Sequence, residues 1–477
     1  MQKILSSRFR NEYVIASIGI ILFAIIQLLG FNGLYGQDSY QYVQYCTAWT
    51  TYFAEGNHPG DYQWPLNYPI NGALLAHVFG MSTTTALQML SLLALIGNGI
   101  LLNRLINVLF PKINRNRLVW VIIGFIFVPY VMRTGLVAMS DQYASFLSLL
   151  AFYATIKVVK QGKHWWVLGL VVFGSLAVMT RYICALMILP MGIYILPYLW
   201  KNRVWLPSLV AAGIGLLPFL PHYFIRIQNL VGFVDHAALY RWSIGNMFSR
   251  TFESNSGQFK FTLPNVLYIF RPFVHVGFLF FGGVLVLFIR RLKLTKELVL
   301  IGVISFGFLF FIAGIDTQND RYFVTVMPFI SLLVYPLFNG LIEWIENRSK
   351  RLVIPGILVL LVARMSLAGY AFLRFYQINL EEQQLALLFD GVEGKTVYTY
   401  GSEMMLSNYN KNNTFLTLHE QEGLDPDSGT LFLFNKAWVN HSQVKGLFHV
   451  TLWKELNQAG RLTSLDTLNE WVLYEVN

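Results

Sequence analysis

Long apolar stretches recur along most of this chain and limit the folds that are open to it. Each stretch has roughly 17 to 25 residues, and as a helix it is long enough to cross about 30 Å of hydrocarbon. With 55% hydrophobic and 13% charged residues among 477, the chain has the composition of a polytopic membrane protein. We therefore predict about eleven transmembrane helices. They cover residues 13–33, 83–103, 118–137, 142–159, 165–180, 182–200, 204–225, 272–289, 298–315, 322–342 and 352–373.

Three segments lack this apolar length: the loops 34–80 and 226–271, and the tail 375–477. Within the first loop, residues 69–80 are apolar but too few to span, which predicts a re-entrant or interfacial helix. The tail alternates short apolar runs with charged and Asn-rich turns, a pattern typical of strands. We predict strands at 396–400, 414–418, 431–434 and 471–476, and helices at 381–389 and 450–459.

The expected fold class is therefore an α-helical polytopic membrane protein with a small C-terminal α/β domain outside the membrane. The transmembrane module occupies residues 1–374 and the extracytoplasmic domain residues 375–477. Transmembrane helices are surrounded by membrane lipids, so we expect these lipids to be partners of the chain.

Lysine and arginine gather in every second loop, which is the pattern of cytoplasmic loops. The first of these groups is Lys3, Arg8 and Arg10, and the last is Arg348, Lys350 and Arg351. We therefore predict a cytoplasmic N-terminus and an extracytoplasmic C-terminal domain, in a cell membrane that we expect to be the bacterial inner membrane. The formal net charge of +10 follows from this topology, so we expect no nucleic-acid partner.

Ionisable residues collect at the outer ends of the predicted spans. In so apolar a chain, residues of this type call for an explanation. Asp38 begins the first outer loop and Asp141 begins the fourth span; Arg181-Tyr182 and Arg321-Tyr322 lie at two further span ends. Each has a simpler interpretation, because Asp38 and Asp141 could cap helices and the arginines could reach lipid headgroups.

The outer loops contribute further candidates for binding a ligand. His58 and Tyr68 lie in the first loop, where an aromatic ring could stack on a sugar or could belong to the interfacial aromatic belt. His236 and Arg241 lie in the loop 226–271, whose residues suit closure over a sugar and its phosphate or, alternatively, a solvated cap over the bundle.

Taken together, these motifs resemble the GT-C superfamily of integral-membrane glycosyltransferases, which use polyprenyl-phosphate sugars. The resemblance rests on Asp38, on Asp141, on Thr180-Arg181-Tyr182 and on the segment 320–328, and it covers about three quarters of the chain. It implies that Asp38 is the catalytic carboxylate and that Asp141 is the acidic group of the next outer loop. Where family members use Mg²⁺ or Mn²⁺, Asp38 and Asp141 would be the ligands here, although no second carboxylate stands two residues from Asp141.

These residue types suit sugar transfer from a lipid phosphate. The reaction needs a base near the acceptor hydroxyl and cations that offset charge on the departing phosphate. Asp38 would supply the base or orient the acceptor, Arg181 and Arg321 would hold the phosphate, and direct attack would invert the anomeric carbon. The acceptor could be a lipid, a glycan or a protein. The alternatives are a non-catalytic carrier or flippase of lipid-linked saccharides, and a scaffold without activity.

Overall fold

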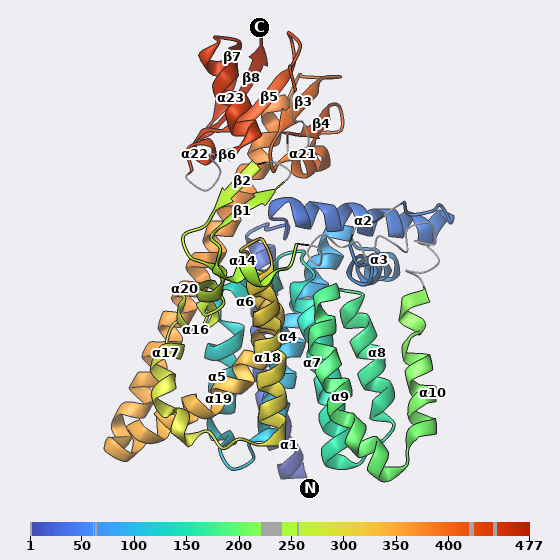
Figure 1. Ribbon diagram of the computed structural model, residues 1–477, viewed down its shortest axis with the longest axis vertical. Coiled ribbons are helices and arrows are strands. Elements are labelled where there is room, and N and C mark those ends of the chain that lie inside the picture. Colours follow the sequence, from blue (N-terminus) through green and yellow to red (C-terminus); the bar gives the residue numbers. More distant parts are fainter. Residues whose placement is uncertain are drawn as a thin grey trace.

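A helical bundle with a small sheet domain at one end makes up the computed structural model of the protein (Figure 1). The structure describes residues 2–60, 62, 64–220, 241–254, 257–418, 424–441 and 446–477. Within these residues, seven helices are long and apolar enough to cross a membrane. They are α1 (Gln2–Leu28), α4 (Thr83–Leu109), α7 (Asp141–Gln161), α9 (Ala185–Asn202), α18 (Lys296–Gly314), α19 (Tyr322–Arg348) and α20 (Lys350–Ala386).

Two further helical pieces meet at 71°, and the number of spans is eight if this bent pair is counted as one. The first piece comprises α5 (Arg117–Val121) and the π-helical turn η2 (Ile122–Ile126), and the second is α6 (Pro129–Leu136). Pro129 has no N–H to donate to the preceding turn, so the helix is interrupted there and restarts with proline in its first turn. Two further apolar helices are short, α8 (Trp166–Val178) and α10 (Trp205–Gly215), and η4 (Leu217–Phe219) follows α10.

The predicted count of eleven spans is therefore not confirmed, and the continuous span expected at residues 272–289 is wrong. That stretch is divided into α16 (Arg271–Val274), α17 (Gly282–Leu285) and the 3₁₀ helix η5 (Val286–Arg291). His275 has extended backbone angles that end α16. Gly282 packs so closely on Phe273 that an added Cβ would lie 2.5 Å from its carbonyl oxygen. A hydropathy profile detects the length of an apolar stretch. It does not detect the break in the helix that accompanies the contact between Gly282 and Phe273.

Two helices of the first outer loop lie at the end of the bundle that faces the sheet domain (Figure 1). α2 (Gly36–Glu55) runs across the bundle end, and Gly56 terminates it in the left-handed conformation with φ of 78°. The predicted short helix at 69–80 is present as α3 (Asn67–Phe79). Aromatic rings join the two, since Tyr42 lies 5.0 Å from Tyr68 between ring centroids.

The described part of the second outer loop connects the bundle to the sheet domain. It contains α14 (Ile244–Phe248), β1 (Thr251–Ser254), β2 (Gly257–Lys260) and α15 (Asn265–Tyr268). β2 pairs with β1 and, on its other edge, with β6 (Gly446–Leu447) of the C-terminal domain, both antiparallel. The loop is thereby tied to the domain through backbone hydrogen bonds.

The C-terminal domain has a five-stranded mixed sheet of order β4-β3-β5-β8-β7, so the predicted small α/β domain is confirmed. Its core comes from β5, whose residues Leu431, Phe432, Leu433 and Phe434 are all buried. The strands are β3 (Thr396–Thr399), β4 (Thr414–Thr417), β5 (Leu431–Asn435), β7 (Leu462–Leu468) and β8 (Trp471–Val476). The helices are η6 (Leu387–Phe389), α21 (Glu403–Tyr409), α22 (Lys436–Val439) and α23 (Phe448–Gln458).

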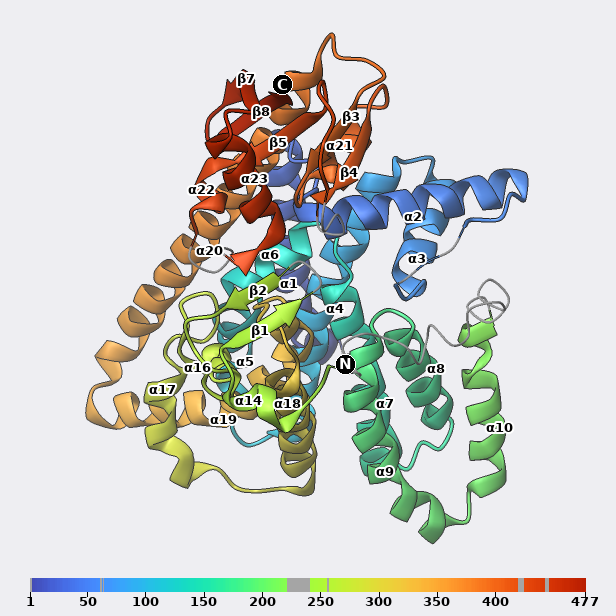
Figure 2. The ribbon, with the colours of Figure 1, turned by 45° about the horizontal axis from the view of Figure 1, so that its top comes forward.

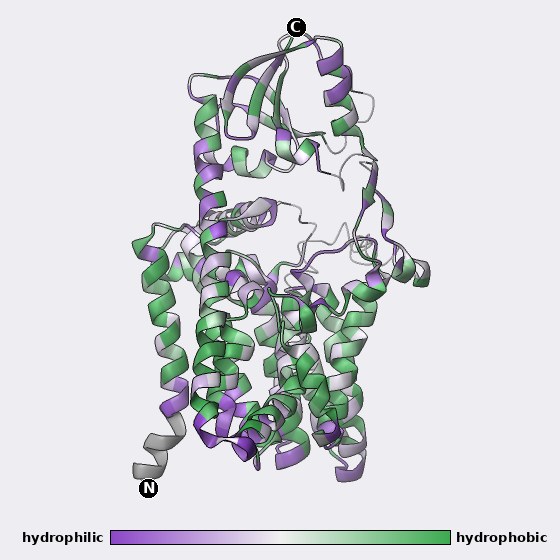
Figure 3. Ribbon diagram, turned by 90° about the vertical axis from the view of Figure 1, so that its left-hand side faces the viewer, coloured by the Kyte–Doolittle hydropathy of each residue, from purple (hydrophilic) through white to green (hydrophobic). Residues whose placement is uncertain are grey.

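α20 joins the bundle to this domain as one unbroken helix, running obliquely up the edge of the molecule (Figure 2). It passes through the predicted boundary between residues 374 and 375, so no flexible linker separates the two parts there. The N-terminal end of α1 and the sheet domain lie at opposite ends of the bundle (Figure 1). Hydrophobic residues occupy the middle of the bundle and hydrophilic residues gather at the end far from the domain (Figure 3). Which end faces the cytoplasm stays a prediction.

Candidate active site

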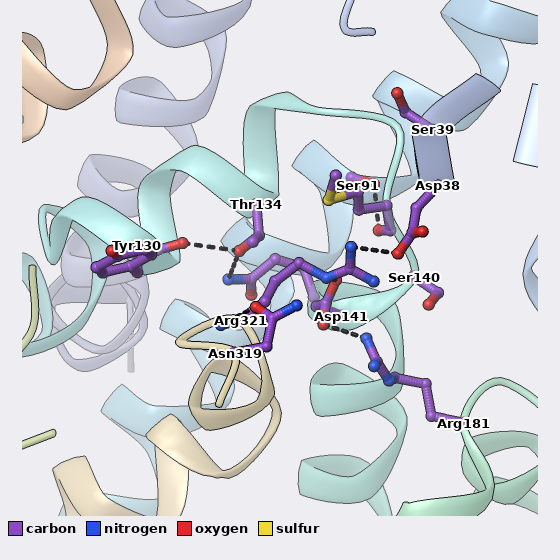
Figure 4. A network of polar contacts seen from close by, with 12 residues as sticks. Asp38, Ser39, Ser91, Tyr130, Thr134, Ser140, Asp141, Arg181, Asn319 and Arg321 are labelled. Atoms are coloured by element: carbon purple, nitrogen blue, oxygen red, sulfur yellow. Dashed lines mark hydrogen bonds and ion pairs between the residues drawn. The ribbon is translucent and has the colours of Figure 1, made fainter. Parts of the chain in front are cut away.

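Asp38 lies in the first turn of α2, close to α20 and α21. The N-cap residue of α2 is Tyr35, so the alternative that Asp38 caps this helix is wrong. The carboxylate instead forms an ion pair with Arg321 through Oδ2 (Figure 4). The Asp38 side chain keeps 36% of its surface exposed, so it can still meet a ligand.

Asp141, the first residue of α7, is completely buried and contacts two arginines. Its Oδ1 pairs with Arg181, which precedes the short helix η3 (Tyr182–Cys184), and its Oδ2 lies 3.1 Å from Nε of Arg321. Arg321 is the N-cap residue of α19. Asp38, Arg321, Asp141 and Arg181 thus form a row of alternating charges, which we call the charge cluster (Figure 4). Four elements distant in sequence meet at this point.

The two carboxylates of the cluster act on the pKa of the arginine between them, Arg321. Burial by itself would lower the pKa of Arg321, but the carboxylates of Asp141 and Asp38 outweigh burial and raise that pKa above the ordinary value for arginine. Next to the cluster, burial raises the pKa of Tyr42 to about 12, so its hydroxyl stays protonated within hydrogen-bond distance of Ser140 Oγ, 2.7 Å away. The cluster is neutral as a whole, with Asp38 as its most exposed member.

A cavity of about 760 Å³ opens beside the cluster, between α6, the loop 261–275 and the turn before α19. None of the four cluster residues lines it, but Asn319 and Asp320, which immediately precede Arg321, do. Its other lining residues are Tyr130, Arg133, Phe261, Thr262, Leu263, Tyr268, Arg271, Val274, His275 and Gln318.

The cavity wall carries more positive than negative charge. Arg271 pairs with Asp320 at 2.9 Å, and the hydroxyl of Tyr130 donates to the same carboxylate at 2.8 Å. The guanidinium of Arg133 lies over aromatic rings instead, 4.2 Å from the centroid of Phe375 and 4.8 Å from that of Tyr130. Within the described ranges Arg133 forms no ion pair, so it is a cation whose charge an incoming anion could neutralise.

The two tyrosines predicted beside the arginines do lie next to the cluster. Tyr322 follows Arg321, and its ring centroid is 5.9 Å from Cζ of Arg181. Tyr182 follows Arg181 and is partly buried in η3. Neither arginine reaches toward lipid headgroups as the simpler interpretation allowed, because each is paired with a carboxylate.

The four remaining predicted residues are not part of this cluster. His58 is exposed and follows the C-terminal end of α2, and the helix rises by roughly 25 Å between Asp38 and Glu55. Tyr68 is fully buried, and its hydroxyl bonds Leu87 O at 2.9 Å and Ser91 Oγ at 2.7 Å, so it serves the core and cannot stack on a sugar. Arg241 is exposed and pairs with Asp316 at 3.2 Å. His236 lies outside the described residues.

The predicted metal ligands, Asp38 and Asp141, do not fit a divalent cation in this arrangement. The guanidinium of Arg321 takes the position between their carboxylates that a shared cation would need. Across the described residues, no group of three or more His, Cys, Asp or Glu side chains is placed to hold a metal ion. We therefore assign no chemical step to a metal.

Sequence reasoning missed the residues of the cavity wall, although one of them carried a signal. Arg133 is the single basic residue in the apolar stretch 118–137, and an arginine in such a place calls for a functional explanation. Asp320 begins the segment 320–328 on which the resemblance rests, but its pairing with Arg271 could not be predicted, because that pairing depends on the broken segment after residue 271.

Comparison with solved structures places the whole chain alongside membrane proteins of known fold. No protein-family model matches the sequence, and no curated protein matches it. ArnT from Cupriavidus metallidurans bound to undecaprenyl phosphate aligns with a TM-score of 0.61 and 11% identity, covering 97% of each chain. The apo state of that protein aligns with a TM-score of 0.58 and 12% identity, covering 96% of this chain and 98% of the other. An oligosaccharyltransferase from Archaeoglobus fulgidus, tethered to an acceptor peptide, gives a TM-score of 0.45 and 13% identity over 86% of this chain and 64% of that one.

The fold and the site together define a multi-pass membrane protein whose charged cluster faces a domain outside the bundle. The chain has the GT-C fold, as its sequence predicted.

Proposed function

We propose that this protein is a membrane glycosyltransferase that moves a sugar from a polyprenyl-phosphate donor to a hydroxyl of a lipid, glycan or protein acceptor on the extracytoplasmic face. The fold and the undecaprenyl phosphate bound by the ArnT structure support this class of donor. The observation that carries the proposal is the charge cluster, which buries Asp141 completely and leaves Asp38 partly exposed. Arg321, the ion-pair partner of Asp38, directly follows Asn319 and Asp320 of a cavity wall with excess positive charge.

Asp38 is the base of the proposed reaction. Its ion pair with Arg321 uses Oδ2, which leaves Oδ1 to accept the proton of the acceptor hydroxyl. As that O–H bond breaks, the acceptor oxygen bonds to the anomeric carbon, and the bond between this carbon and the phosphate oxygen breaks. The polyprenyl phosphate leaves with the electron pair. One displacement of this kind inverts the configuration of the sugar.

The arginines stabilise the charge that develops on the departing phosphate. Arg133 and Arg271 line the cavity, and Arg321 adjoins it through Asn319 and Asp320. Asp141 holds Arg181 and Arg321 in place and, being fully buried, does not touch the substrate. Tyr182 and Tyr322, beside the two arginines, border the donor in this proposal.

A carrier of lipid-linked saccharides is the second candidate, and one observation favours it. Arg364 is fully buried within α20, and none of its guanidinium nitrogens has a hydrogen-bond partner among the described residues. It packs over Phe280 and Phe281, 4.7 and 5.0 Å from their ring centroids, on the broken segment after α16. Transporters place ionisable groups and interrupted helices inside the membrane in this way. The charge cluster, however, sits at helix ends, where chemistry at the membrane surface takes place.

A transfer assay in proteoliposomes separates the two candidates. Purified protein is given a radiolabelled polyprenyl-phosphate sugar with a mixture of acceptors, and release of polyprenyl phosphate is compared with movement of the donor between leaflets. We expect release, and we expect it to continue undiminished in EDTA, because Arg321 occupies the place of a shared cation. Donor movement without release would replace the enzyme by a carrier, and loss of release in EDTA would reinstate the metal.

Arg133→Met should weaken donor binding while leaving the fold intact. A hydrogen bond to a charged group contributes about 1.5 to 3 kcal/mol, so the KM for the donor should rise roughly 10- to 100-fold. Methionine keeps much of the apolar contact with Phe375. Arg115→Met is the matched control, because Arg115 is 79% exposed and pairs with Glu346 near the far end of the bundle. An unchanged KM in Arg133→Met would remove this residue from the donor site.

A further inference from the structure

One carboxylate from outside the bundle accepts two hydrogen bonds from the segment that carries Asp38. Glu382, near the end of α20, accepts a hydrogen bond from Gly36 N at 3.3 Å through Oε1. Its Oε2 accepts one from the hydroxyl of Tyr40 at 2.7 Å. Gly36 and Tyr40 stand two residues before and two residues after Asp38. Glu382 therefore bridges the first turn of α2 with Asp38 at its centre.

Other contacts from the C-terminal part reinforce this bridge. The side-chain oxygen of Gln37 accepts hydrogen bonds from Met404 N at 3.1 Å and Met405 N at 3.3 Å, at the start of α21. The side-chain amide of Asn379 donates to Leu34 O at 2.9 Å. Every one of these partners follows residue 374, so the C-terminal part of the chain holds backbone groups before Asp38 and the Tyr40 side chain after it.

The bridge leaves little room for the segment to shift. Tyr40 is fully buried, and its ring packs edge-on against Tyr409 of α21 at 5.8 Å between centroids. The Asp38 carboxylate itself is held by Arg321 of the bundle. The C-terminal part thus holds the chain next to Asp38, while the bundle holds its carboxylate. The direction of the Asp38 side chain relative to the bundle therefore depends on Glu382.

We infer that Glu382 is a positioning residue, and that one role of the C-terminal domain is to hold the first turn of α2 so that Asp38 stays aligned with the donor cavity. This inference rests on the proposed function of Asp38. Among the described residues Glu382 forms no hydrogen bond or ion pair with Asp38 and does not line the cavity, so it acts through Gly36 and Tyr40. Misplacement of a reacting group by about 1 Å costs on the order of 100-fold in rate, so a bridge of this kind has a large effect on turnover.

The test compares Glu382→Ala with Glu382→Gln and with the neighbouring change Glu381→Gln. Glu381 accepts a hydrogen bond from the side chain of Asn469 at 2.8 Å in the C-terminal domain. In the part of the chain that the structure describes it forms no hydrogen bond or ion pair with α2, so it controls for loss of charge at the same place. We expect Glu382→Ala to lower kcat roughly 10- to 100-fold with the KM for the donor unchanged. Glu382→Gln, which retains one acceptor oxygen, should lower kcat less, and Glu381→Gln should match the unmodified protein.

Combining Glu382→Ala with Asp38→Asn distinguishes positioning from a general structural role. If Glu382 acts through Asp38, the alanine change should have almost no further effect on the residual rate of Asp38→Asn. An equal loss of rate in both backgrounds, or a loss that appears only in the KM or in thermal stability, would overturn the inference. Tyr40→Phe removes one arm of the bridge while keeping the ring, and full kcat in both Tyr40→Phe and Glu382→Gln would also overturn it. Failure of the proposed function would be seen separately, as normal turnover in Asp38→Asn alone.

Discussion

Asp38→Asn is expected to abolish nearly all sugar transfer while the donor still binds. Asparagine keeps the size of the side chain and can still contact Arg321, but it cannot take a proton from the acceptor hydroxyl. General base catalysis contributes roughly 10²- to 10⁴-fold, and kcat should fall by that factor. The KM for the donor should change little, because the cavity that holds the phosphate is lined by other residues.

Steady-state release of polyprenyl phosphate, measured over a range of donor concentrations, checks this expectation. Asp316→Asn is a suitable control, because Asp316 is also an ion-paired carboxylate near the outer end of α18, and its partner Arg241 lies outside the cluster. A fall in turnover of the same size in both variants would point to a general effect on the fold.

Asp141→Ala should cause the largest loss of stability. Asp141 is fully buried, and it is a shared counterion of Arg181 and Arg321, whose side chains are only 15% and 10% exposed. Removing one partner of a buried ion pair costs about 3 to 5 kcal/mol, because the remaining charge is left without compensation. The thermal unfolding midpoint in detergent should fall clearly, whereas Asp316→Ala, which breaks a more exposed pair, should shift the free energy of unfolding by less than about 1 kcal/mol.

The double change Asp141→Met with Arg181→Met shows whether charge is the cause. Replacing both members of a buried pair by apolar groups of similar volume is often close to neutral. In that variant Arg321 retains Asp38 as its partner. Stability should therefore recover in large part, while donor turnover stays low because Arg321 has lost one of its two anchors. A double variant as unstable as Asp141→Ala would show that packing at this position matters more than charge.

The bundle and the small domain could be predicted from the sequence because their signals are local. Apolar length alone marks α1, α4, α7, α18 and α19. Short apolar runs between polar turns predict β3, β4, β5 and β8. β7 was not predicted, because most of its residues are exposed and polar. The segment 272–289 was mispredicted for the opposite reason, since its composition is that of a span and its backbone is not.

Residues of the candidate site could be predicted from the sequence only where they lie at span ends on one side of the membrane. Asp38, Asp141, Arg181 and Arg321 share that position, and the structure brings all four together. The order of pairing was not predictable, because it depends on the packing of α2, α7, α8 and α19. The role of Glu382 could not be predicted for the same reason, since 342 residues separate it from Tyr40 in the chain.

Single-turnover transfer tests the central claim most directly, with enzyme in excess over a labelled polyprenyl-phosphate sugar and the donor bound before the acceptor is added. The unmodified protein is predicted to release polyprenyl phosphate in one fast phase, and Asp38→Asn is predicted to bind the same amount of donor and to release it roughly 10²- to 10⁴-fold more slowly. Equal rates of release in the two proteins would contradict the assignment of Asp38 as the base and with it the proposed role of the charge cluster.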